Sequence, residues 1–146
     1  MPAKLISNAD ILARRILVID DEDANVLLLA SVLEREGYRD VHCLTDPEQA
    51  LASYIGLAPD LVLLDLMMPK VDGFMLLEAF ARHDQPDEFR PVLVLTADTT
   101  LQTRRRALAL GAKDFVAKPF DVIEVALRIS NLLETRILYE RLRQKS

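Results

Sequence analysis

The chain has 146 residues, the size of one ordinary domain, and 51% of it is apolar, enough for a full hydrophobic core. Its 18 basic and 23 acidic residues give a net charge of −5 without a basic block, which argues against nucleic acid or an anionic membrane surface as the main ligand. No apolar run approaches the roughly 18 residues of a membrane span and no signal-peptide pattern is present, so we expect a cytoplasmic protein.

Five short apolar runs predict β-strands. They lie at 15–20, 40–44, 60–65, 91–97 and 114–119. Three are unbroken and rich in Val, Leu and Ile, which is typical of strands buried on both faces of a parallel sheet. The run at 40–44 alternates more and suits an edge strand. It contains Cys43, the only cysteine, which we expect to be a small buried hydrophobe.

Helical patterns fill the gaps between these runs, after a weakly patterned leader at 1–13. The first helix is expected from Asp23 or Ala24 to Glu36, with Gly37 as its stop. The others are expected at 47–55, capped by Asp46 and ended by Gly56; at 74–82, after Asp72 and Gly73; at 101–110, opened by Thr99 or Thr100 and closed by Gly111; and from Asp121 to about Leu142. Strand and helix alternate five times, which predicts a doubly wound α/β domain with a parallel sheet.

The last helical pattern continues beyond the domain. Apolar residues recur at steps of three and four, at Ile129, Leu132, Leu133, Ile137, Leu138 and Leu142, with Arg136, Arg141, Arg143 and Lys145 between the later ones. We expect only the first half of this helix to lie on the sheet, because the second half has nothing of its own domain to cover. Residues 134–146 are therefore interpreted as a helical stalk or linker; a frayed, solvated end is the alternative.

Polar residues follow four of the five predicted strands. Asp20 and Asp21 follow the first, Asp65 the third, Thr96 the fourth and Lys118 the fifth. Ligands of open α/β sheets bind outside the carboxyl ends of the strands, so we expect these side chains at one edge. Taken singly, each is equally well a cap or a surface residue, but together they favour a functional site.

The chemistry of this set suits phosphoryl transfer. Neighbouring carboxylates raise one another's pKa, and a hard cation such as Mg²⁺ compensates their charge. Lys118 adds a compact positive charge for a phosphate oxygen, and Thr96 adds a hydroxyl donor. Asp65 can then act as a nucleophile that forms an acyl phosphate, while Mg²⁺ and Lys118 neutralise the charge of the transferred group.

Four segments together resemble a response regulator receiver domain: ILVIDDE, DLVLLDLMMPKVDGF, VLVLTA and GAKDFVAKPF. The resemblance covers 15–133 and places the receiver domain at 14–133. It implies a flavodoxin-like sheet of five strands in the order 2-1-3-4-5. It also implies that Asp65 accepts a phosphoryl group from a sensor histidine kinase or a histidine phosphotransfer protein, in two-component signalling.

The resemblance also implies roles for single residues. Mg²⁺ would be held by Asp20, Asp21, Asp65 and the backbone carbonyl of Met67. Lys118 would pair with the phosphate, and the Lys118–Pro119 peptide bond would be cis. Thr96 would turn toward the phosphoryl oxygen while Phe115, the switch aromatic, swings inward. This motion would reshape the surface of the helix at 101–110, the strand at 114–119 and the last helix. Met67 and Asp98 would tune dephosphorylation by shielding or orienting the attacking water.

Output and partners are less constrained. The segment NLLETRILYERL is similar to the junction of regulators that continue into HD-GYP or GGDEF domains, so the chain is either a stand-alone regulator or the receiver of a longer protein. A homodimer through the helices at 101–110 and 122–142, or through the last helix alone, is compatible with it. Arg104, Arg105 and Arg106 form either a solvated face or a docking patch. The alternatives are a pseudo-receiver that only binds proteins, and a haloacid-dehalogenase-like phosphatase, which requires an acid at the position of Met67.

Overall fold

The computed structural model describes residues 6–145, with Lys145 described by its backbone alone. Strands and helices alternate along the chain as predicted. They are α1 (Asn8–Leu12), β1 (Arg15–Ile19), α2 (Asp23–Glu36), β2 (Asp40–Leu44), the 3₁₀ turn η1 (Pro47–Gln49), α3 (Ala50–Leu57), β3 (Leu61–Asp65), α4 (Gly73–His83), β4 (Val92–Thr96), α5 (Leu101–Ala109), β5 (Asp114–Ala117) and α6 (Val122–Lys145). None of these helices combines the length and apolarity that a membrane span requires.

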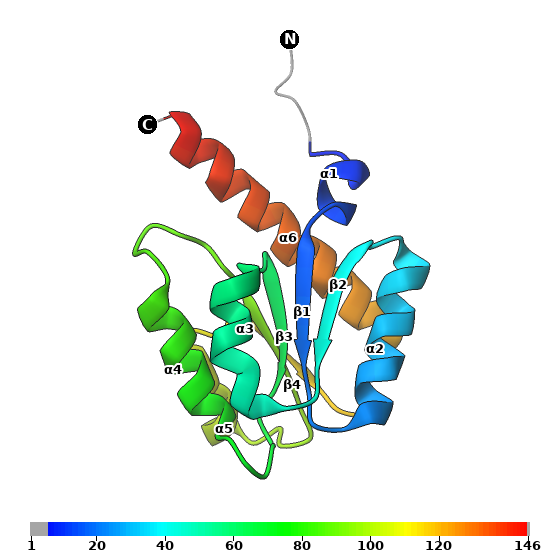
Figure 1. Cartoon of the computed structure of the whole chain (residues 1–146), viewed down its shortest axis with the longest axis vertical. Coiled ribbons are helices and arrows are strands. Elements are labelled where there is room, and N and C mark those ends of the chain that lie inside the picture. Colours follow the sequence, from blue (N-terminus) through cyan, green and yellow to red (C-terminus); the bar gives the residue numbers. More distant parts are fainter. Residues whose placement is uncertain (1–5, 146) are drawn as a thin grey trace.

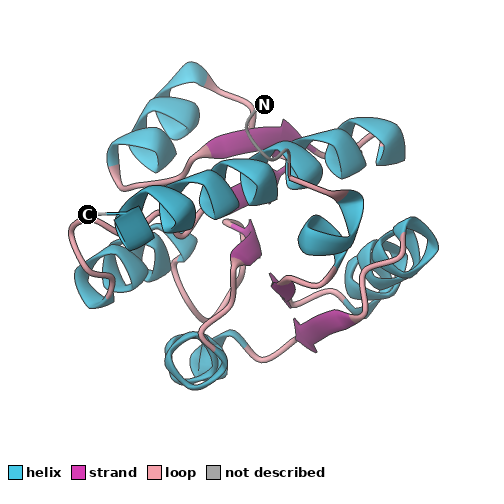
Figure 2. Cartoon of the chain, turned by 90° about the horizontal axis from the view of Figure 1, so that it is seen from above, coloured by secondary structure: helices cyan, strands magenta, loops and turns pink. Residues whose placement is uncertain are grey.

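The strands form one parallel sheet in the order β2-β1-β3-β4-β5, which confirms the predicted doubly wound α/β fold (Figure 1). Helices lie on both sides of the strands (Figure 2). Side chains alternate across the sheet, so residues of the same strand serve two separate cores. On β1, Ile16 and Val18 pack with α2 and α6, whereas Leu17 and Ile19 pack with α3, α4 and α5. The unbroken apolar runs are explained by this double coverage.

Capping residues set the helix boundaries largely where the sequence predicted them. The side chains of Asp72 and Thr100 accept backbone hydrogen bonds at the first turns of α4 and α5, and Asp46 does the same for η1. Gly37 ends α2 in a left-handed conformation (φ 99°), which glycine adopts without a steric penalty.

Two local predictions were wrong. The second predicted helix does not stop at Gly56 but runs to Leu57, because the left-handed position that ends it falls on Ala58 (φ 48°), just before Pro59. Cys43 is exposed rather than buried. It lies on the edge strand β2, whose side chains are only partly covered, so the alternation of this strand was a better guide than the usual burial of cysteine.

The leader contains a short helix that the sequence did not predict. Ser7 caps α1, and Ser7 and Asp10 bond reciprocally to each other's backbone N–H groups in a capping box. Ile11 is buried in the same core as residues of α6, and α1 lies beside α6 (Figure 1). Residues 1–5 of the predicted leader lie outside the described part of the chain.

The expectation that the second half of the last helix covers nothing was also wrong. Ile137 is only 2% exposed and belongs to the core that contains Ile11. The ring of Tyr139 stacks on Phe89, with 4.9 Å between the ring centroids. The sequence did not predict this burial because the covering residues come from α1 and a loop. Neither segment has a sequence pattern that identifies it as a packing partner of α6. Leu138 and Leu142, by contrast, are exposed as expected.

Candidate functional site

Three carboxylates meet at the carboxyl end of the sheet. Asp20 directly follows β1 and Asp65 ends β3, and these two strands are neighbours in the sheet. Oxygen atoms of Asp20, Asp21 and Asp65 lie within 4.8 Å of one another. Asp20 is 2% exposed and Asp65 is 4% exposed, so two of these acids are almost fully removed from water.

One cation reaches into this cluster from the end of β5. The Nζ atom of Lys118 lies 2.8 Å from Oδ2 of Asp20 and 3.4 Å from Oδ2 of Asp65. The backbone N–H of Lys118 donates to the carbonyl of Thr96 (2.9 Å), which anchors the loop to the end of β4. The Lys118–Pro119 peptide bond is cis, the geometry that the resemblance implies. Among the described residues, this ammonium pairs with two of the three carboxylates, so negative charge remains at the site.

The pKa values of Asp65 and Lys118 reflect this imbalance. Burial raises the pKa of Asp65, and the charge of Asp20 raises it further, although the N–H of Met67 and the ammonium of Lys118 oppose the shift. Burial lowers the pKa of Lys118, but the hydrogen bond to Asp20 and the charges of both acids outweigh it, so the net pKa is raised. Lys118 therefore stays charged at neutral pH.

The donor set fits a hard divalent cation. The Oδ1 atom of Asp21 is buried, and no group in residues 6–145 forms a hydrogen bond to it. A buried acceptor without a partner costs free energy, and a bound cation would remove this cost. Carboxylate oxygens are the ligands that Mg²⁺ and Ca²⁺ prefer. The acidic triad can therefore hold a metal ion.

The loop after β3 is fixed close to Asp65. The backbone N–H of Met67 donates to Oδ1 of Asp65 (3.1 Å), while the Met67 side chain is 57% exposed. Gly73 opens α4 directly against this loop, and a Cβ at this position would lie 2.6 Å from the Cα of Leu66. Because the obstacle is backbone, only glycine fits here without a shift of the loop.

Thr96 and Asp98 are joined by a hydrogen bond at the end of β4. Thr96 is fully buried, and its hydroxyl accepts the N–H of Asp98 (3.2 Å). The Asp98 carboxylate accepts from the N–H of Thr100 (3.0 Å) and the hydroxyl of Thr103 (2.8 Å), and its pKa is lowered by the first of these bonds. In this structure, Asp98 therefore organises the start of α5.

Phe115 is partly buried on β5 and packs on the core beneath α3, α4 and α5. The guanidinium carbon of Arg104 lies 5.4 Å from the centroid of its ring. The sequence did not indicate this contact, nor the ion pair between Lys118 and Asp20. Both join residues on separate elements, and no spacing along the chain indicates such a distance.

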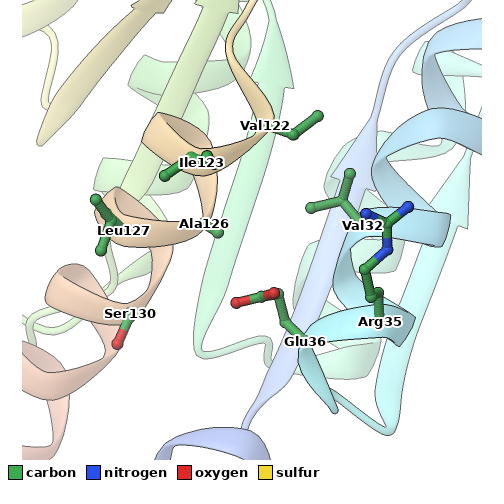
Figure 3. A pocket seen from close by; sticks show the side chains of 8 residues that line it. All are labelled: Val32, Arg35, Glu36, Val122, Ile123, Ala126, Leu127 and Ser130. Carbon is green, nitrogen blue, oxygen red and sulfur yellow. The ribbon is translucent and has the colours of Figure 1, made fainter.

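A separate hollow of about 290 Å³ lies between α2 and α6 (Figure 3). Val32, Arg35 and Glu36 of α2 face Val122, Ile123, Ala126, Leu127 and Ser130 of α6 across it. None of these residues belongs to the acidic cluster, so the chemistry of the site does not depend on this hollow.

Comparison with known proteins agrees with this geometry. The family model of the response regulator receiver domain matches residues 16–130, and the acidic cluster, Thr96 and Lys118 all lie within this range. The chain belongs to the response regulator receiver family. As a receiver domain, it is a module of two-component signalling rather than an ordinary enzyme.

Relatives of this receiver are much longer than the chain. It is 42% identical over 119 residues to the DNA-binding dual master transcriptional regulator RpaA of Synechocystis sp., covering 82% of this chain and 48% of RpaA. It is 37% identical over 134 residues to the response regulator PleD of Caulobacter vibrioides, covering 92% of this chain and 29% of PleD. The chain thus spans about half or less of these two proteins.

Solved structures show the same fold. NtrX from Brucella abortus is 32% identical with a TM-score of 0.81, over 92% of this chain and 30% of NtrX. A CheX–CheY–BeF3–Mg²⁺ complex from Borrelia burgdorferi is 29% identical with a TM-score of 0.75, over 82% of this chain and 88% of that one.

Proposed function

We propose that this receiver domain accepts a phosphoryl group on Asp65 from a phosphohistidine of a sensor histidine kinase or a histidine phosphotransfer protein, with Mg²⁺ as cofactor. The observation that carries the proposal is the imbalance of the site. Three carboxylates lie together at the strand ends, and two of them pair with the ammonium of Lys118. The third has a buried oxygen that lacks a hydrogen bond in the described chain.

Asp65 is the nucleophile of this reaction. One of its carboxylate oxygens forms a bond to phosphorus as the bond from phosphorus to the donor's imidazole nitrogen breaks, and the electron pair passes to that nitrogen. Asp20, Asp21, Asp65 and the carbonyl of Met67 would hold Mg²⁺, which would neutralise charge on the phosphoryl oxygens. The pairing of Asp20 and Asp21 with a cation also removes the repulsion that otherwise disfavours a charged Asp65.

Lys118 stabilises the product. In the structure its ammonium lies closer to Asp20 (2.8 Å) than to Asp65 (3.4 Å). A phosphoryl group on Asp65 would bring new anionic oxygens close to the ammonium of Lys118. As a compact point charge, the ammonium would pair with these oxygens. The hydroxyl of Thr96 donates to another of these oxygens after it leaves the N–H of Asp98.

The output surface comprises α5, β5 and α6. When Thr96 turns toward the phosphoryl group, the ring of Phe115 follows it inward, and the surface around β5 changes. This change controls a partner, dimerisation or an output domain joined through residues 134–146. The greater length of the relatives supports an output domain of this kind. We also infer that the regulator is cytoplasmic. A phosphatase of the haloacid dehalogenase kind is not proposed, because Met67 lies where its acid is required.

Phosphorylation by a small donor tests the proposal. The protein is incubated with acetyl phosphate and Mg²⁺, and intact mass is compared for the parent, Asp65→Asn and Asp46→Asn. Asp46 caps η1 after β2 and provides a matched carboxylate outside the cluster. We expect one added phosphoryl group on the parent and on Asp46→Asn, and none on Asp65→Asn or without Mg²⁺. Equal modification of Asp65→Asn would refute the proposal.

A further inference from the structure

Three consecutive arginines on α5 have different environments. Arg104 lies over the ring of Phe115 on β5, at 5.4 Å from its centroid. Arg106 lies over the ring of Phe74 on α4 at 4.0 Å, and 4.0 Å from the carboxylate of Asp72. All three arginines are exposed, and Arg105 has no such ring contact among the described residues. Arginines 104 and 106 therefore attach α5 to the elements on either side of it, and this face is more than a solvated surface.

Arg104 contacts the ring of Phe115, whereas Arg106 contacts the ring of Phe74. A cation within about 6 Å of an aromatic centroid is attracted by the negative face of the ring. Phe74 lies at the start of α4, beside the fixed loop that follows Asp65. Phe115 is the residue whose ring changes position in the proposed switch. In the proposed switch, the Arg104 contact is therefore the one of the two that changes.

We propose that Arg104 is a positioning residue of the switch, which holds the ring of Phe115 in its resting position. This inference rests on the proposed function, because it assigns the contact to the state before phosphorylation. When the ring turns inward, it leaves the guanidinium of Arg104, and the attraction is lost. A contact made only in the resting state shifts the equilibrium toward that state by its own free energy.

The prediction concerns the affinity for a phosphoryl mimic. Beryllofluoride with Mg²⁺ is titrated into the parent, Arg104→Ala, Arg105→Ala and Arg106→Ala, and binding is followed by ¹⁹F NMR. Loss of an exposed cation–π contact specific to the resting state should tighten binding about two- to fivefold in Arg104→Ala. Arg105→Ala removes the same charge from the same helix, and Arg106→Ala removes a contact common to both states. Both should bind as the parent does.

A second pair of variants tests whether Arg104 acts through the ring. In a Phe115→Leu background, the change Arg104→Ala should leave the affinity for beryllofluoride unaltered, because no ring remains to hold. A purely structural role would instead change the melting temperature and persist without the ring. Arg104→Lys, which keeps the charge and the stem, should restore part of the resting preference.

The outcomes separate this inference from the function on which it rests. If the parent fails to bind beryllofluoride and Mg²⁺, the proposed function fails and the role of Arg104 falls with it. If the parent binds and Arg104→Ala matches it, the function stands and the role of Arg104 is refuted. Equal tightening in Arg104→Ala and Arg105→Ala also refutes it, since a general charge effect would then suffice.

Discussion

The two ends of the sheet hold their carboxylates in opposite ways. At the amino end, Asp60 accepts hydrogen bonds from Arg136 (2.6 Å), from Arg14 (3.4 Å) and from the backbone N–H of Arg15 (2.8 Å). At the carboxyl end, Asp20 and Asp65 share the ammonium of Lys118. The buried Oδ1 of the neighbouring Asp21 has no hydrogen-bond partner in the described chain. The Asp60 carboxylate is satisfied by the protein itself, whereas the acidic cluster keeps a buried acceptor that a cation could satisfy.

This difference separates anchoring from function. The Asp60 network ties α6 to the starts of β1 and β3, and Arg14 adds a 2.7 Å ion pair to Glu140 of α6. It fixes the direction in which α6 leaves the sheet. A satisfied network has little reason to bind a ligand, but an unsatisfied acidic cluster gains free energy from one. The incomplete pairing of the acidic cluster therefore favours the carboxyl end of the sheet as the place for a cation.

The largest expected effect comes from breaking the satisfied end. Arg136 is 8% exposed, and Asp60→Ala removes the shorter of its two carboxylate contacts, 2.6 Å to Asp60 against 3.5 Å to Glu140. Removing one partner of a buried ion pair should cost about 3 kcal/mol of unfolding free energy, measured by urea denaturation. Asp87→Ala, which breaks an exposed pair between a loop and Arg143 of the same helix, should cost less than about 1 kcal/mol. A similar small loss in both variants would show that the network does not anchor α6.

Asp21→Asn should lower the affinity of the acidic cluster for Mg²⁺ without destabilising the fold. The change removes the charge of a carboxylate whose buried oxygen has no partner, so we expect Mg²⁺ affinity to fall about tenfold. Isothermal titration calorimetry measures it, and Asp23→Asn, an exposed acid at the start of α2, is the control. Unchanged Mg²⁺ affinity in Asp21→Asn would show that the triad is not the site.

Asp65→Asn should stabilise the metal-free protein by about 1 kcal/mol at neutral pH, because burial disfavours the charged form of Asp65. A raised folded-state pKa means that the folded protein holds this proton more tightly than the unfolded chain does. The contribution to stability is fully present below the unfolded pKa, and it is lost as pH rises through the folded pKa. The advantage of Asp65→Asn should therefore grow as pH rises from acidic to neutral, in denaturation series with EDTA. A constant or shrinking advantage would contradict the raised pKa.

The smallest effect is expected at Met67, beside the acceptor. Its exposed apolar side chain should shield an acyl phosphate from water, so Met67→Asn should accelerate hydrolysis severalfold, or about 1 kcal/mol of barrier. Loss of the phosphoryl group after removal of acetyl phosphate is followed by mass spectrometry. Met75→Asn alters another exposed methionine, on α4, and should hydrolyse at the parent rate. Identical lifetimes in all three proteins would remove Met67 from the account.

Much of the site could be predicted because it depends on strand ends. Parallel strands place their carboxyl ends together, so Asp20, Asp65 and Lys118 could be assigned to one edge before any contact was known. Capping residues such as Asp72 and Thr100 likewise act through neighbours two or three residues away, and their signals are local. The fold and the acidic cluster followed from these short-range rules.

Contacts between distant segments could not be predicted in this way. The burial of Ile137 depends on α1, more than one hundred residues earlier, and a five-residue helix has too weak a pattern to reveal itself. The hydrogen bond of Lys118 to Asp20 and the position of Arg104 over Phe115 depend on side-chain directions across elements. Residue type and spacing alone do not specify such directions.

Mapping of the modified residue tests the central claim most directly. After treatment with acetyl phosphate and Mg²⁺, borohydride reduces an acyl phosphate on aspartate to homoserine, which tandem mass spectrometry locates in the sequence. We predict homoserine at position 65 alone, and only when Mg²⁺ is present. Homoserine at Asp60, or at any acid outside the cluster, or its absence from a folded protein, would contradict the account.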